Sequence, residues 1–284
     1  MIINVLRAEL HKLRKRPAAW IIVCVWLAMV LTFAYLIPYL IYRRGGLPGP
    51  DGAGSSGQLL AGVLPASLVS NTLEGYPLFG GALILILGAL ATGGEYGFGT
   101  LKTLLTQGPR RIEVLGGMLA ALAVVALGCT AASFAVSAGA SSLIAVVESA
   151  PGAFPPAAEL ARGLAAGWLI LGMWGLLGAL AGIAFRSTAL AVGLSLVWAL
   201  VVENLIRGFA ALLSVFDTLQ RALPGVNADS LVAALRATGP TAGEQGRPGV
   251  TAVVSGTQAA VVLACYVAGF VLAAGILLTR RDAT

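Results

Sequence analysis

The stretch from Gly93 to Thr103, GGEYGFGTLKT, contains the residue types of a phosphate-binding loop. A Walker loop follows the pattern GxxxxGK[ST], in which backbone amides surround the phosphates and the lysine reaches their terminal oxygens. In this chain Leu101 occupies the position of the glycine that should precede Lys102. The dinucleotide pattern GxGxxG fails too, because Lys102 stands where its third glycine is required. We therefore predict that this loop does not hold a nucleotide.

Other catalytic arrangements are equally incomplete. A serine protease working within a membrane needs a histidine as base for a serine such as Ser141, but the only histidine, His11, lies in the basic N-terminal segment. No HExxH pattern is present for a zinc protease. The chain has three cysteines, Cys24, Cys129 and Cys265, and all three fall within apolar segments. We interpret them as small packing groups. The sequence predicts no enzyme activity, no metal and no cofactor in this chain.

The composition is that of a membrane protein. Apolar residues make up 58% of the chain, the mean hydropathy is +0.91, and only 11% of residues are charged, against about 25% in soluble domains. A membrane-spanning helix needs about 20 apolar residues. We therefore predict one all-α transmembrane domain over residues 1–284, with six spans at Ala18–Tyr42, Tyr76–Gly94, Val114 to about Ser137, Gly163–Phe185, Ser187–Val202 and Val250–Thr279.

The distribution of charge predicts the orientation in the membrane. With the N-terminus inside, the inner segments carry a net charge of +7 and the outer segments −1. Positive charge concentrates on the cytoplasmic side of membrane proteins. We expect a multi-pass protein of the plasma membrane with both termini in the cytoplasm, and we expect no nucleic acid partner.

Two segments outside the spans have helical periodicity. Residues 1–17 place Ile3, Leu6, Leu10 and Leu13 on one face and basic residues on another, which predicts an amphipathic helix in the headgroup layer. It serves either as an anchor or as a contact for a partner. Residues 203–249 predict an external helical loop, with an amphipathic helix that ends at Pro224-Gly225. A second short helix follows, capped by Asp229 or Ser230 and reaching Leu235.

Ion-coupled transport usually needs charged groups within the spans, and the centres of the six segments have none. Glu203, at the outer end of the fifth span, either lines a pathway or caps an interfacial helix. The small-residue patterns Gly163xxxGly167 and Gly178xxxGly182 predict close helix packing, within one chain or across a dimer.

Two stretches resemble the membrane (permease) subunit of ABC-2 type ATP-binding-cassette exporters. They are AELHKLRKRPAAW before the first span and GEYGFGTLKTLLTQGPRRIEVL between the second and third. The resemblance implies a homodimer or heterodimer of permease subunits driven by separate cytoplasmic ATPase subunits, which hold ATP and Mg²⁺. It also implies an N-terminal helix on the membrane surface, and short external helices between spans five and six. One departure is Met118, where family members often carry a lysine.

The resemblance further implies that residues 93–113 form a cytoplasmic coupling loop that docks into the ATPase subunit. Its implied contact residues are Glu95, Tyr96, Gly97, Phe98, Gly99, Thr100, Leu101, Leu104, Leu105, Arg110 and Arg111. If residues 98–106 are helical, Phe98, Leu101 and Leu105 share one apolar face with Leu104 at its edge. Three alternatives remain: an ordinary loop joining two spans, a non-transport scaffold or immunity protein, and a secondary transporter.

Overall fold

The computed structural model describes residues 2–45, 56–97, 111–210, 212–237 and 252–280. Within these ranges the regular structure is entirely helical, which confirms the all-α prediction. The predicted coupling residues from 98 to 110 lie outside the described ranges. The helices are α1 (Ile2–Lys15), α2 (Pro17–Met29), α3 (Ile37–Arg43), α4 (Ser56–Val63), α5 (Leu68–Leu73), α6 (Gly81–Gly97), α8 (Arg111–Val147), α9 (Ala157–Phe185), α10 (Thr188–Leu196), α11 (Glu203–Ala210), α12 (Ser214–Gln220), α13 (Pro224–Arg236) and α14 (Gly256–Arg280).

Six continuous helical segments in the described part are long and apolar enough to cross a membrane, as predicted. They are Pro17–Arg43, Tyr76–Glu95, Arg111–Val147, Ala157–Phe185, Thr188–Ala210 and Gly256–Arg280. Three of them include a π-helical segment, at Val30–Leu36, Tyr76–Gly80 and Val197–Val202. Such wider turns leave individual backbone groups free for other partners. The carbonyl oxygen of Ala34 is one of these groups, since Pro38 four residues later has no N–H to donate, and the side-chain amide of Asn71 donates to it at 2.8 Å.

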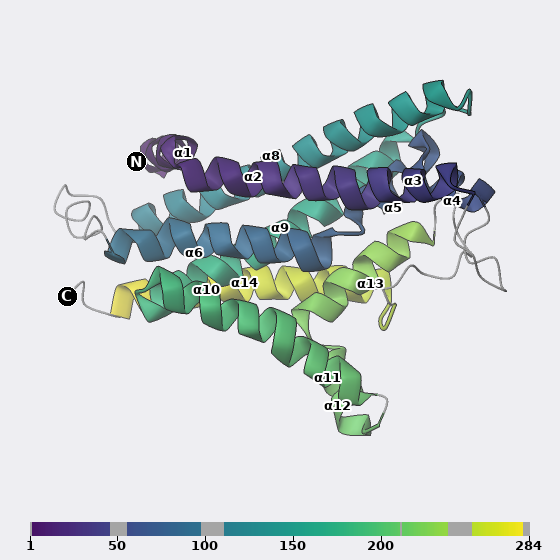
Figure 1. Cartoon of the computed structure of the whole chain (residues 1–284). Coiled ribbons are helices and arrows are strands. Elements are labelled where there is room, and N and C mark those ends of the chain that lie inside the picture. Colours follow the sequence, from purple (N-terminus) through teal and green to yellow (C-terminus); the bar gives the residue numbers. More distant parts are fainter. Residues whose placement is uncertain (1, 46–55, 98–110, 211, 238–251, 281–284) are drawn as a thin grey trace.

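The second, third and fourth spans form the centre of the bundle. In each of these three spans, between 44% and 67% of the residues in the most apolar 18-residue stretch are buried. In the first, fifth and sixth spans the corresponding fraction is only 17% to 22%. Figure 1 shows α6 and α9 side by side in this centre. A Cβ added to Gly178 of α9 would lie 2.0 Å from the carbonyl oxygen of Leu85 in α6. Glycine is therefore required where these two backbones touch.

The two small-residue patterns of α9 pack within the chain. A Cβ on Gly163 would meet Val69 and Phe134, and one on Gly167 would meet Tyr76 and Thr130. Gly182 lies against Thr92, whose hydroxyl donates to the carbonyl oxygen of Ala179 at 2.9 Å. Of the two roles left open by the spacing, the intrachain contact is the one these glycines have.

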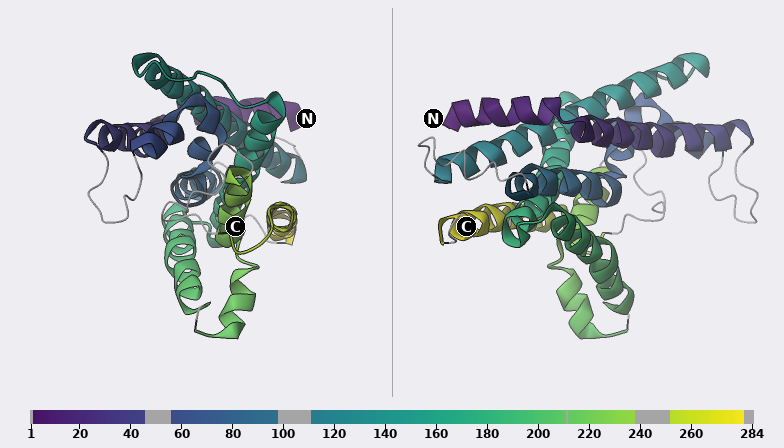
Figure 2. Two further views of the ribbon diagram at one scale, coloured as in Figure 1. Left: turned by 90° about the vertical axis from the view of Figure 1, so that its right-hand side faces the viewer. Right: turned by 60° about the vertical axis from the view of Figure 1, so that its left-hand side comes forward.

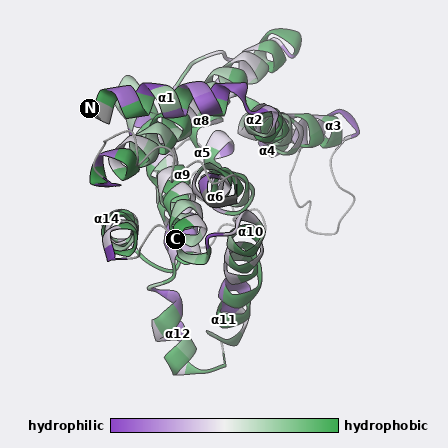
Figure 3. Ribbon diagram, turned by 90° about the vertical axis from the view of Figure 1, so that its left-hand side faces the viewer, coloured by the Kyte–Doolittle hydropathy of each residue, from purple (hydrophilic) through white to green (hydrophobic). Residues whose placement is uncertain are grey.

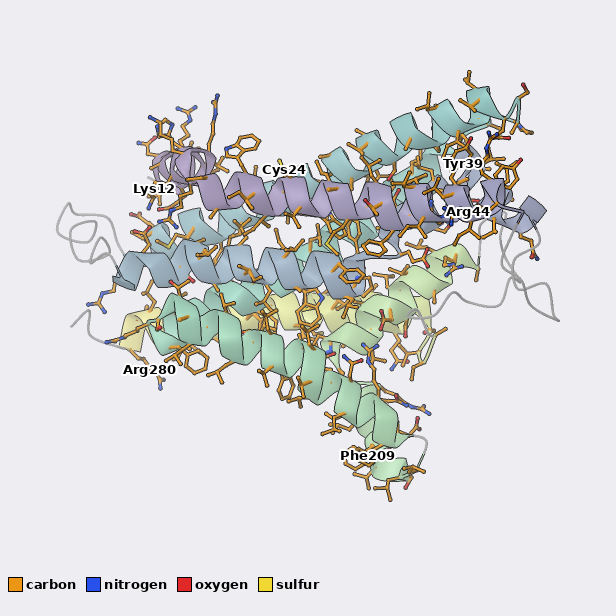
Figure 4. All side chains as sticks on the ribbon, viewed as in Figure 1. Lys12, Cys24, Tyr39, Arg44, Phe209 and Arg280 are labelled. Atoms are coloured by element: carbon orange, nitrogen blue, oxygen red, sulfur yellow. The ribbon has the colours of Figure 1, made fainter. Side chains whose placement is uncertain are left out.

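The two ends of the bundle differ in which segments meet there. The N-terminal helix, the last turn of α6, the first turn of α8 and the last turn of α14 lie at one end (Figure 1). Lys12 and Arg280 mark this end in Figure 4, and Tyr39 and Arg44 mark the opposite end. Helices α11 and α12 project away from the bundle (Figure 2), with Phe209 on the projecting part.

Several predicted boundaries are wrong. The third span does not end near Ser137 but continues as α8 to Val147. Asp229 and Ser230 do not cap a short helix: they lie inside α13, which begins at Pro224, because proline suits the first helical turn where its missing N–H is not needed. The helix predicted up to Pro224 is interrupted, since α11 ends at Ala210 and α12 begins at Ser214. Helix α5, which was not predicted, is buried along its whole length.

Candidate functional site

Four charged residues meet where the N-terminal helix approaches the end of the second span. Glu95, near the end of α6, has a side chain that is only 3% exposed. Its Oε1 accepts hydrogen bonds from Lys12 Nζ at 3.2 Å and from Arg16 Nη2 at 3.1 Å. Lys12 also pairs with Glu9 of the same helix at 2.6 Å. We call Glu9, Lys12, Arg16 and Glu95 the N-terminal charge cluster.

The local sequence explains why these basic residues face α6. Arg16 has an extended conformation, and Pro17 then begins α2. Because a residue before proline is disfavoured in the helical region, the chain turns between α1 and α2. The turn lays α1 along α8, where a Cβ on Gly117 would come within 2.4 Å of Val5. Figure 3 shows the mixed hydrophobic and hydrophilic faces of α1.

The apolar face of α1 is only partly the predicted one. Leu13 is buried, and Leu6 and Leu10 pack against the core, whereas Ile3 is 64% exposed. Three of the four predicted residues therefore fix α1 against the bundle, and this contact positions Lys12 and Arg16 for Glu95.

The N-terminal charge cluster is electrically balanced and partly dehydrated. Burial raises the pKa of Glu9, and the hydrogen bond from Lys12 opposes that rise. Arg16 makes a second contact with α6, donating from Nη1 to the carbonyl oxygen of Leu90 at 3.0 Å. With two acids and two bases ionised, the four side chains sum to zero charge. The guanidinium of Arg16 makes two contacts with α6, and the carboxylate of Glu95 accepts two hydrogen bonds. Together they fix α1 to the last turns of α6 more firmly than one surface ion pair would.

The structure distributes the predicted contact residues over three places. Glu95 belongs to the N-terminal charge cluster, and Tyr96 and Gly97 form the end of α6. Arg111 begins α8 and donates from Nη1 to the carbonyl oxygen of Leu278 in α14 at 3.3 Å. The remaining predicted contacts lie outside the described residues: Phe98, Gly99, Thr100, Leu101, Leu104, Leu105 and Arg110.

Lys12 and Arg16 were not predicted as partners of Glu95. One signal in the sequence points to such a pairing, because an acid at the end of an apolar span needs a compensating cation and the basic segment before the first span supplies several. The pattern does not say which cations are used, because that depends on where the turn at Pro17 places α1.

Glu203 lies in a second buried charge cluster. Its side chain is 1% exposed, and its Oε2 accepts a hydrogen bond from the backbone N–H of Gly225 at 2.9 Å, in the first turn of α13. Arg207 Nη2 lies 3.9 Å from the same oxygen, and Arg207 Nη1 pairs with Asp229 of α13. We call Glu203, Arg207 and Asp229 the Glu203 cluster. Burial raises the pKa of Asp229 to about 6, although Arg207 opposes the rise.

The cluster corrects part of the sequence interpretation. Glu203 does accept from the N-terminal turn of a helix, but that helix is α13, which follows it by about twenty residues and is packed into the bundle. The nine residues from Pro224 to Val232 are all buried. Glu203 therefore fixes α13 to the fifth span.

A third cluster closes the opposite end of the bundle. Glu148, just after α8, accepts hydrogen bonds from Tyr39 at 2.7 Å, Tyr42 at 3.1 Å and Arg43 at 3.2 Å. The hydrogen bond from Tyr39, with those from Tyr42 and Arg43, lowers the pKa of Glu148. The end of the first span is thus tied to the end of α8.

Comparison with known proteins adds no assignment to this geometry. No protein-family model matches the chain, and no curated protein matches it either. In the described ranges, no three side chains of histidine, cysteine, aspartate or glutamate gather as metal ligands. The charge clusters are therefore the features of this chain that bear on its function.

Proposed function

We propose that this chain is the membrane-spanning permease subunit of an ATP-driven exporter of the ABC-2 type, and that separate ATPase subunits drive it. The observation that supports the proposal best is the N-terminal charge cluster. It joins α1 to α6 immediately before residues 98–110, the segment whose sequence resembles a coupling loop. A force applied to that segment reaches both the second span and the N-terminal helix.

Two neighbouring contacts extend the connection beyond α6. Helix α1 lies along α8 through Val5 and Gly117, and Arg111 at the start of α8 donates to the end of α14. Residues 98–110 connect α6 to α8 in the sequence. A movement of this segment would therefore move the second, third and sixth spans together. A permease that opens and closes a pathway requires such a coordinated movement.

The proposed orientation places the N-terminal charge cluster in the cytoplasm and the Glu148 end outside, in the plasma membrane. The positive charge of the inner segments supports this orientation. In it, α1 lies at the inner membrane surface with its basic face toward the lipid headgroups, and α11 and α12 lie toward the outer side. No residue of this chain performs chemistry on ATP, and ATP with Mg²⁺ belongs to the partner subunit.

The proposed assembly contains two permease subunits. The first, fifth and sixth spans expose large apolar side chains, including Phe33, Trp198 and Leu272. In a bilayer such surfaces are covered by lipid or by another helix. A second permease subunit, identical or related, would cover part of them, and lipid would cover the rest.

The proposal is tested by placing charges on the predicted apolar face of the coupling segment. Burying each leucine there contributes about 1.5–3 kcal/mol to docking, so Leu101→Asp with Leu105→Asp should abolish recovery of the ATPase subunit in a pull-down. Thr103→Asp with Gln107→Asp adds the same charge away from this apolar face, at one position within the predicted helix and one just after it, and should leave recovery intact. Full recovery of an active complex with the leucine double variant would refute the coupling role. Failure of that variant alone to accumulate in the membrane would show that the leucines pack within this chain.

A secondary transporter is the second candidate, and the buried Glu203 cluster favours it. Charged residues placed inside a membrane bundle are often ion-coupling groups. The two candidates differ in energy source. Transport by an ABC exporter should stop when ATP is depleted and continue when the proton gradient is dissipated, and a secondary transporter should show the reverse.

A further inference from the structure

The Glu203 cluster is not balanced in charge. Two carboxylates, Glu203 and Asp229, share one guanidinium, that of Arg207, so full ionisation leaves one negative charge. Both acids are almost fully buried, at 1% and 4% exposure. An uncompensated charge in such a place carries a large desolvation penalty, and the usual relief is to bind a proton or a cation.

The surrounding elements supply no further cation in the described part of the chain. The π-helical turn before α11 contributes the Trp198 indole, and α14 contributes the hydroxyl of Tyr266, which donates to the carbonyl oxygen of Ala222. Helix α13 contributes Asn227, whose amide donates to the carbonyl oxygens of Arg221 and Leu223. Each of these groups is neutral, so Arg207 is the one cation that faces both acids there.

A second observation is independent of the charge count. Glu203 Oε2 is occupied by the N–H of Gly225 and the Trp198 indole lies near the carboxyl, but Glu203 Oε1 is buried and has no donor within hydrogen-bond geometry. The side-chain oxygen of Asn227, two residues beyond Gly225, is likewise a buried acceptor without a donor. Buried polar atoms are nearly always paired. These two vacant acceptors lie on the two elements that the cluster joins, whereas the one vacant donor of the cluster is Arg207 Nε, which belongs to a group that is already fully protonated.

We propose that Glu203 and Asp229 form a proton-binding site, which holds one exchangeable proton between the fifth span and α13. The bond that forms is O–H on a carboxylate oxygen, and the bond that breaks is an O–H of hydronium in the solvent, which leaves as a water molecule. With the proton bound, the cluster is neutral. Without it, the contact between the fifth span and α13 carries one negative charge.

The geometry favours a proton over a metal ion. A metal cation needs several oxygen ligands, for calcium about six to eight. The cluster offers one vacant carboxylate oxygen, Glu203 Oε1, and the guanidinium of Arg207 lies 3.9 Å from the other oxygen of the same carboxylate. That guanidinium repels a metal ion. A proton needs only a single oxygen. The burial that raises the pKa of Asp229 to about 6 acts in the same direction, since it strengthens proton binding.

Infrared difference spectroscopy of the purified full-length chain tests the site without any partner. The carbonyl stretch of a protonated carboxyl is compared between about pH 5 and about pH 8. Ordinary aspartates and glutamates are fully ionised at about pH 8 and largely ionised at about pH 5. Every sample carries Glu9→Gln, because in the described part of the chain Glu9 is a further carboxyl whose pKa is raised by burial. We expect a band from about one carboxyl per chain that disappears as the pH rises.

Glu203→Gln and Asp229→Asn should each abolish this band, because either change leaves one acid paired with one arginine. Glu148→Gln, at the opposite end of the bundle, is the matched control and should leave the band unchanged. Absence of a titrating band in the protein with both acids present would overturn the proposal, even if neither variant folds. Loss of the band in only one variant would overturn the proposal that the two acids share one proton. Loss of the band on addition of sodium at constant pH would show that the site binds a metal cation, which would also overturn the proposal. The test does not depend on the proposed transport function, since it uses the isolated chain.

Discussion

Replacing Glu95 by glutamine should release the N-terminal helix from the bundle. The change keeps the size of the side chain and an acceptor oxygen, but removes the charge that Lys12 and Arg16 share. Breaking a fully buried ion pair costs about 3–5 kcal/mol. Lys12 and Arg16 are 35% and 30% exposed, so water compensates part of this loss. We expect the docking of α1 to weaken by about 1–2 kcal/mol, between the values for buried and surface pairs.

The release can be measured at Leu13, which lies on the face of α1 that is buried against the bundle. A cysteine at position 13, in a chain with Cys24, Cys129 and Cys265 removed, reacts with a maleimide only when α1 leaves the bundle. A loss of 1–2 kcal/mol corresponds to about 5- to 30-fold in the undocked fraction, and the labelling rate should rise by the same factor. Adding Arg16→Gln to Glu95→Gln should cost less than the sum of the two single changes, because both remove one interaction.

The matched control is Glu159→Gln, which makes the same chemical change in the first turn of α9, away from α1. Its labelling rate should stay within about twofold of the parent chain, since Glu159 is partly exposed to solvent and lies in a helix turn away from α1. If Glu95→Gln labels no faster than this control, then the N-terminal charge cluster does not hold α1, and the proposed connection between α1 and α6 is wrong.

Three further predictions concern the packing, the orientation and the acid sensitivity. Gly178→Ala should lower the unfolding temperature, because overpacking against the carbonyl oxygen of Leu85 costs about 1–3 kcal/mol, whereas Gly172→Ala on the same helix meets nothing within 4 Å and should be neutral or slightly stabilising. A cysteine at position 55 should react with an impermeant maleimide in intact cells and one at position 102 should not, and the opposite pattern would reverse the orientation. Because its hydrogen bonds lower the pKa of Glu148, that carboxylate stabilises the fold above its ordinary pKa and loses this effect as the pH falls through the lowered value. Glu148→Gln should therefore be less stable at neutral pH and lose less stability on acidification, and an unchanged pH profile of the unfolding temperature would contradict this role.

The six spans could be predicted because their signal is local. A run of about 20 apolar residues identifies a membrane-spanning helix whatever its neighbours are. The polar helix α5 gave no such signal, since Ser70, Asn71 and Thr72 are buried only because the bundle surrounds them. Its position depends on a hydrogen bond from Asn71 to Ala34, in a π-helical turn of another span. Pro38 indicates in the sequence that the carbonyl of Ala34 lacks its helical donor, but it does not reveal that Asn71, 37 residues later in the chain, supplies the replacement.

The charge clusters show the same division between local and distant information. Glu95 was selected from its place in a stretch that resembles a coupling loop, but its partners lie 83 and 79 residues earlier in the chain. Glu203 was selected as a rare charge at the end of a span, while its connection to Gly225 and Asp229 depends on how α13 returns to the bundle. The sequence thus indicates that Glu95 and Glu203 are unusual acids, but the residues that pair with them depend on tertiary packing.

The prediction that Pro224-Gly225 ends a helix is wrong because the same dipeptide suits two positions. Proline and glycine commonly follow the end of a helix, yet proline is also favoured in the first helical turn. In the structure Pro224 begins α13, and the missing side chain of Gly225 lets Glu203 approach, since a Cβ there would lie 2.2 Å from Oε2. The contact with Glu203 decides between the two positions, and that contact is not visible in the local sequence.

ATP hydrolysis by the chain, alone and with any P-loop ATPase found in a neighbouring reading frame as the proposed ATPase subunit, tests the central claim most directly. We predict that the purified chain in lipid vesicles neither binds nor hydrolyses ATP, because Leu101 replaces the glycine that a Walker loop requires before Lys102. Together with the ATPase subunit it should form a stable complex that hydrolyses ATP. Specific nucleotide binding to the isolated chain that is lost on Lys102→Ala, or failure of any such subunit to associate with it, would contradict the account.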